Sequence, residues 1–112
     1  MDETAFRTVA DATLERIGLA LDATLETSNA SFDWTLDDGV LTIASGDAQV
    51  VVRRDVAARA IVLEASGGSV AFRAADGRWI DEDATPLADA LVRALKSVAR
   101  VALRRVPDLP AS

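Results

Sequence analysis

The feature that most constrains the fold is a series of turn signals dividing residues 32–81 into short segments of alternating polarity. Phe32, Trp34 and Leu36 alternate with polar residues, which is the period of a strand with one buried face. Short Asp- and Gly-containing sequences, which favour tight turns, interrupt the alternation at Asp37-Asp38-Gly39, Ser45-Gly46-Asp47, Gly67-Gly68 and Asp76-Gly77. The pattern predicts an antiparallel meander of about six strands. The expected strands cover 32–36, 40–44, 49–54, 60–65, 70–74 and 78–81.

Two segments with helical periodicity flank the strands. Apolar side chains recur every three or four positions in residues 3–26, and again in residues 86–104. Asp2 is placed to cap the first helix, and Thr85-Pro86 supplies a cap and a first-turn proline for the second. Residues 106–112 are expected to form a short tail. With every strand between the two helices, both helices most simply cover one face of the sheet, which predicts a two-layer α+β sandwich.

Histidine and cysteine are both absent from the 112-residue chain, whose length suits a single domain. Their absence excludes disulfides, thiolate metal sites, the usual general base and the commonest transition-metal ligand. Carboxylates remain as the side-chain ligands for a metal. No apolar run approaches the ~20 residues of a membrane span, and the N-terminus shows no signal or transit pattern. We expect a cytoplasmic bacterial protein, or a mitochondrial matrix protein in a matured eukaryotic form.

The formal net charge of −6 is concentrated in the N-terminal part of the chain. Residues 1–47 carry ten acidic side chains against two arginines, whereas residues 48–112 carry eight acidic side chains against ten basic ones. This imbalance opposes nucleic-acid binding and favours a cation or a basic protein surface as the partner.

An acidic stripe on the first helix is the leading candidate site. Asp11, Glu15, Asp22 and Glu26 follow at spacings of four, seven and four, which places them within roughly 60° of one another. No Lys or Arg shares that arc, although like charges at i,i+4 destabilise a helix by about 0.2–0.5 kcal/mol per pair. Carboxylates suit iron, manganese, magnesium or calcium, but a convex helix face cannot enclose an ion, so binding would be weak and hydrated. A solvated charged face is the alternative.

Relief of this repulsion predicts that Asp11→Asn or Asp22→Asn raises stability and weakens cation binding together. Asp33, with Asp37 and Asp38 in the adjacent turn, could extend the acidic patch. The Trp34 and Trp79 side chains lie in alternating strands and are expected to pack in the core.

Taken in order, these segments resemble the frataxin family, whose bacterial form is CyaY. DETAFRTVADATLERIGLALD is similar to the first helix of the family, and DWTLDDGVLTIASGD is similar to its first hairpin. QVVVRRDVAARAIVLEASGG resembles the paired third and fourth strands. FRAADGRWIDEDATPLADALVRAL resembles the final hairpin, with Trp79, leading into the second helix. The resemblance covers nearly the whole chain.

The resemblance implies an α-β sandwich that binds Fe(II) or Fe(III) weakly, without an organic cofactor, and acts in iron–sulfur cluster assembly. It implies a cysteine desulfurase and its scaffold protein as partners, with this chain as iron donor or regulator. Residues along the first helix and first strand would form an acidic ridge. Together with Glu26, the last residue of the acidic stripe, the acidic ridge consists of Asp2, Glu3, Asp11, Glu15, Asp22, Glu26 and Asp33.

Two departures from the family pattern concern the sheet surface that the family uses for its partners. Ile61-Val62-Leu63 stands where the family usually has an exposed Trp, and Arg53-Arg54-Asp55 stands where it usually has Asn-Lys/Arg-Gln. We expect Arg53, Arg54 and Val62 to contact the assembly partners. A monomer is expected, with association under iron load left open.

Two alternative functions remain open from the sequence. One is a ferroxidase or iron-storage activity at the same carboxylates, for which the sequence shows no converging set of ligands. The other is a small acidic binding module of the chaperone type, although no large apolar patch of the kind such modules expose is evident in the sequence.

Overall fold

The computed structural model describes residues 1–103 and 107–111. A helix, six strands and a second helix follow one another along the chain. The first helix is α1 (Glu3–Thr27), and the strands are β1 (Asp33–Asp37), β2 (Val40–Ser45), β3 (Ala48–Asp55), β4 (Ala60–Ala65), β5 (Gly68–Ala75) and β6 (Arg78–Ile80). Helix α2 (Leu87–Ala94) continues into a π-helical turn, η1 (Leu95–Ala99).

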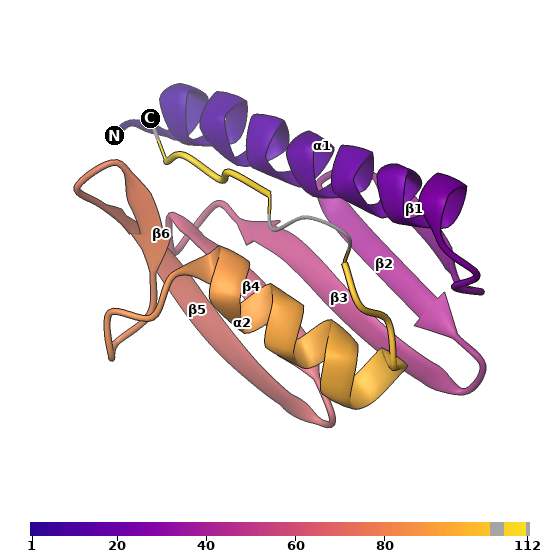
Figure 1. The fold of residues 1–112 in the computed structure, drawn as a ribbon. Helices are drawn as coiled ribbons and strands as arrows, with labels where there is room; N and C mark the ends of the chain where they lie inside the picture. The colour runs from indigo at the N-terminus through magenta and orange to yellow at the C-terminus, as the bar shows by residue number, and fades with distance from the viewer. Residues whose placement is uncertain (104–106, 112) are drawn as a thin grey trace.

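The strands form one antiparallel sheet in sequence order, and both helices lie on the same face of it (Figure 1). The predicted two-layer α+β sandwich is therefore confirmed. None of the helices in the described ranges is both long enough and apolar enough to cross a membrane.

Two-residue turns fix the register of the hairpins. Asp38-Gly39 and Asp76-Gly77 have φ angles of 48° and 76°, and of 52° and 76°, as the tight hairpin turn requires. The first turn pairs Asp37 with Val40, and the second pairs Ala75 with Arg78. Because side chains alternate along a strand, this register sends every second residue toward the helices and the others toward the open face of the sheet.

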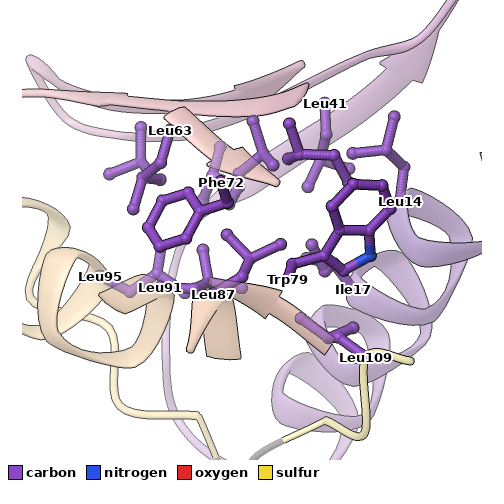
Figure 2. Packing of buried hydrophobic residues seen from close by; sticks show 14 of the residues in the cluster. Leu14, Ile17, Leu41, Leu63, Phe72, Trp79, Leu87, Leu91, Leu95 and Leu109 are labelled. Carbon is purple, nitrogen blue, oxygen red and sulfur yellow. The ribbon is translucent and has the colours of Figure 1, made fainter. Parts of the chain in front are cut away.

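The core lies between the sheet and the two helices, and Trp79 and Phe72 are among its aromatic side chains (Figure 2). Trp79 is only 1% exposed, and its ring meets Phe6 edge to face at a centroid distance of 6.0 Å. Its Nε1–H donates a hydrogen bond to the Thr13 hydroxyl at 2.9 Å. The predicted core position of Trp79 is confirmed, and this side chain joins β6 to α1.

The second helix differs from the prediction at both ends. Pro86, in an extended conformation with ψ of 144°, precedes the first helical residue, and no side chain caps this end, so the predicted cap at Thr85 is wrong. The helix predicted to reach residue 104 ends at Ala99, because Arg100 adopts a left-handed conformation with φ of 57°. Val101 then donates its N–H to the Leu95 carbonyl at 2.9 Å and is buried. Arg104 lies outside the described residues.

The C-terminal segment, residues 107–111 of the predicted short tail, packs on the molecule. It runs beside α1 on the helix side of the sheet (Figure 1), where Leu109 is 7% exposed and Ala111 is 3% exposed. Ala111 donates its N–H to the Gly77 carbonyl at 2.9 Å. Its two prolines disfavour a helix, but they do not prevent an extended segment from covering the core.

Candidate functional site

The acidic ridge lies along α1 and reaches the first strand. Asp2 accepts a hydrogen bond from the Ala5 N–H at 2.7 Å, which confirms it as the helix cap. Glu3 lies 4.0 Å from the Arg7 guanidinium in an exposed pair. Within the described part of the chain, three exposed ridge carboxylates have no hydrogen-bond or ion-pair partner. These are Glu15, Glu26 and Asp33.

Asp11 has a cationic partner that comes from the sheet. Arg54 of β3 donates Nη1–H to the Asp11 carboxylate and lies 3.4 Å from the Asp38 carboxylate through Nη2. The Arg54 side chain is only 13% exposed, since it lies under the β1–β2 turn. A Cβ added at Gly39 would stand 2.5 Å from the guanidinium carbon, so a side chain there would displace Arg54 from its place, and the φ of 76° favours glycine independently.

Asp22 also has a partner from the sheet. The Nε1–H of Trp34 donates to the Asp22 carboxylate at 2.9 Å. The Trp34 ring lies against α1 at Gly18, where an added Cβ would come within 2.7 Å of the ring. Trp34 is therefore half-buried at the margin of the core, with its polar edge directed to the acidic ridge.

These two contacts change the effect expected from neutralising the stripe. The sequence suggested that Asp11→Asn or Asp22→Asn would raise stability, because it showed only like-charged neighbours on one helix. In the folded chain, Asp11 pairs with Arg54 and Asp22 accepts the indole N–H of Trp34. Both carboxylates therefore make a favourable contact, whereas Glu15 and Glu26 have no hydrogen-bond or ion-pair partner among the described residues.

We expect Asp11→Asn to lower the free energy of unfolding by about 0.5–1 kcal/mol, since it weakens a half-exposed pair with Arg54. Glu15→Gln is the matched control on the same helix face, and it should leave stability unchanged or raise it by up to about 0.5 kcal/mol. Urea denaturation of both variants measures whether each substitution lowers or raises the free energy of unfolding. A stabilised Asp11→Asn protein would show that the pair with Arg54 adds nothing.

The ridge is a line of separate carboxylates. Across residues 1–103 and 107–111, no three acidic side chains come together closely enough to hold one metal ion. Separate carboxylates of this kind cannot enclose an ion, and weak, hydrated binding stays a prediction.

The open face of the sheet carries two of the three predicted partner residues. Arg53 lies there and contacts Glu64 of β4 at 2.5 Å, and Val62 pairs directly with Arg53 across the strands. Val62 is only 7% exposed, so it offers much less contact area than the Trp usual in the family. Arg54 follows Arg53 in the strand and therefore points to the helix side, where it pairs with Asp11.

Glu64 is a residue of this surface that the sequence reasoning missed. Its place follows from the β3–β4 register, which sets Val51 opposite Glu64 and Arg53 opposite Val62 on one face. That register depends on the length of the loop between the two strands, which the sequence pattern left loosely defined.

Comparisons with known proteins identify the family. A family model described as a frataxin-like domain matches residues 1–101. Iron-sulfur cluster assembly protein CyaY, from three strains of Vibrio cholerae serotype O1, is 33% identical over 81 residues, which are 71% of this chain and 74% of that protein. A solved frataxin from Psychromonas ingrahamii has the same fold, with a TM-score of 0.75 over 92% of this chain and 96% of that one, at 17% identity. The resemblance seen in the sequence is confirmed, and the chain belongs to the frataxin-like family.

Proposed function

We propose that this chain binds iron weakly at the acidic ridge and acts in iron–sulfur cluster assembly, as iron donor to, or regulator of, a cysteine desulfurase–scaffold complex. The family membership supports this role, since the Vibrio cholerae relative is named an iron-sulfur cluster assembly protein. The structural observation that supports it most is that the ridge and the open sheet face meet at β1. Asp33 there is exposed on the open face, next in sequence to Trp34, which contacts α1.

Iron is the cargo in this proposal, and the ridge attracts it by charge. Glu15, Glu26 and Asp33 are exposed, so a hydrated ion can approach them without displacing a protein group. Asp11 already contacts Arg54, and Asp22 already accepts a hydrogen bond from Trp34. In this proposal they attract the ion by their negative charge and do not bind it directly. Oxygen ligands of this kind suit Fe(II) and Fe(III).

The open face supplies the docking surface in this proposal. Arg53 is half-exposed and paired with Glu64, so an acidic side chain of a partner can replace Glu64 on the guanidinium. Val62 provides a small apolar contact beside it. The cargo and the partner would therefore bind on adjoining surfaces of one rigid sheet and helix.

NMR spectroscopy on the labelled protein tests both parts in one experiment. Fe(II) should broaden amide signals along α1 and β1, and a desulfurase–scaffold complex should then shift signals of β3 and β4. The double variant Glu15→Gln/Glu26→Gln should lose most of the broadening caused by Fe(II) and keep the shifts caused by the desulfurase–scaffold complex. Arg53→Gln should weaken partner binding about tenfold, which equals ~1.4 kcal/mol, and keep the iron effect.

Each variant is thus the control for the other. Spectra that do not change at millimolar iron would remove the iron-binding part of the proposal. Partner binding that is equal in the wild type and in Arg53→Gln would remove the open face as the docking surface.

A further inference from the structure

Strand β5 extends well beyond its neighbour at the edge of the sheet (Figure 1). It has eight residues, whereas β6 has three, and β6 pairs only with Arg73, Ala74 and Ala75. The first five residues of β5, Gly68–Phe72, are paired with β4 on one side and with no strand of the described chain on the other. We call these five residues the free edge.

Two residues of the free edge direct their backbone groups outward. The two-residue Asp76-Gly77 turn makes Ala75 and Arg78 a hydrogen-bonded pair, so Ala75 turns its N–H and C=O toward β6. In an antiparallel ladder these groups alternate from residue to residue, so Ala71 and Ser69 point in the same direction as Ala75. No backbone hydrogen bond involving the outward groups of these two residues is found within the described ranges.

The free edge lacks the features by which proteins block strand pairing. It contains no proline and no charged residue, and its open-face side chains are only Ser69 and Ala71. The opposite edge of the sheet, β1, is five residues long and has an aspartate at each end. The two aspartates oppose the pairing of a new strand at β1, whereas the free edge of β5 has no such feature.

A groove runs beside the free edge, between β5 and the second helix. Its volume is about 480 Å³, and the side chains that line it come from β4, β5, α2 and η1. Val70 and Phe72 supply an apolar part of the lining, and Val70 is 44% exposed, which is unusual for an aliphatic side chain beside a core. The charged residues of the lining are Asp81, Asp83 and Arg93, which together carry one net negative charge.

We propose that the free edge binds an extended peptide segment of a partner protein, which pairs with Ser69 and Ala71 as an added strand. The unpaired backbone groups select an extended backbone, and the alternation of that strand would place one aliphatic side chain in the groove over Val70. The net negative charge of Asp81, Asp83 and Arg93 around the groove favours a basic residue in the segment, placed beside the exposed Asp83. This site lies at the opposite end of the sheet from the acidic ridge, so it serves a different partner contact from the proposed function.

A second copy of this chain fits the free edge less well. Two antiparallel copies can match their outward groups by pairing Ser69 with Ser69, Ser69 with Ala71, or Ala71 with Ala71. Each of these registers brings a residue of the second copy opposite Arg73, where Ile80 already pairs. A flexible partner segment has no such clash.

The test uses the peptide Ac-KVTVTV-NH2 with the full chain, and a control peptide of the same sequence with alternate backbone nitrogens methylated. The unmodified peptide should slow amide hydrogen exchange at Ser69 and Ala71 by about tenfold at millimolar concentration, and the methylated peptide should not. Asp83→Asn should weaken binding of this peptide, but not of a version with threonine in place of lysine.

Two variants block the edge in different ways. Ala71→Pro removes an outward N–H that the β4 pairing does not use, and Val70→Lys places a charge over the groove. In both variants the peptide should no longer slow amide hydrogen exchange at the free edge. If one variant fails to fold, the other still tests the proposal. Unchanged exchange at Ser69 and Ala71, equal effects of the two peptides, or concentration-dependent self-association through β5 would each overturn the proposal.

Discussion

Trp79→Ala should lower the free energy of unfolding by about 3–5 kcal/mol, the range for truncating a large aromatic side chain in a core. Trp79 is 1% exposed and packs edge to face on Phe6. The truncation also removes the donor that reaches the Thr13 hydroxyl at 2.9 Å from β6. Since that contact spans the sheet and α1, its loss should also loosen the helix that carries the acidic ridge. Urea denaturation followed by circular dichroism measures the loss.

Trp34→Ala is the matched control, because both indoles donate a hydrogen bond to a side chain of α1. Trp34 bonds Asp22 at 2.9 Å but is only half-buried. We expect it to lose less than half as much stability as Trp79→Ala, since less of its ring is removed from water. Equal losses in the two variants would mean that the indole hydrogen bonds, and not burial, determine the effect.

The strands were predictable because their signals are local. In Asp76-Gly77, both residues adopt the positive φ angles that a two-residue hairpin needs, and the adjacent residues then pair without help from the rest of the molecule. The same holds for Asp38-Gly39. Once the turns are fixed, alternation determines which side chains enter the core, and Trp79 was placed correctly on this basis.

The contacts of the acidic ridge were not predictable in the same way. Asp11 and Arg54 are 43 positions apart in sequence, and a helical projection shows only neighbours on the same helix. Successive side chains of β3 point to opposite faces of the sheet, and only the register shows which of them face the helices. Arg53 faces the open surface and Arg54 faces the helices, so the expectation that both act on one face was wrong. For the same reason the sequence showed no favourable contact of Asp11, and the contact with Arg54 leads us to expect the opposite sign for Asp11→Asn.

The C-terminal part of the chain shows a second limit of the sequence pattern. Its apolar residues were interpreted as a continuing helix and a tail, since periodicity detects amphipathic helices and strands but not extended coil. Val101 is buried because the left-handed Arg100 ends the helix and turns the chain inward. Leu109 is buried because the segment returns along α1, a position that only the assembled core defines.

Leu109→Ala should therefore lower the free energy of unfolding by about 2–5 kcal/mol, although Leu109 lies in a segment without helix or strand. Its neighbours in the segment contact α1, since Arg16 donates to the Asp108 carbonyl at 3.3 Å and the Pro110 carbonyl lies 3.4 Å from the Thr13 hydroxyl. Faster hydrogen exchange in the first half of α1 should accompany the loss of stability.

Leu19→Ala makes the same chemical change on α1 at a side chain that is 69% exposed, and it should shift stability by no more than about 0.5 kcal/mol. The comparison separates burial of the C-terminal segment from leucine truncation as such. If Leu109→Ala costs as little as Leu19→Ala, the segment does not seal the core. If it costs the expected amount, the position of the acidic ridge depends on residues 107–111 as well as on the sheet beneath α1.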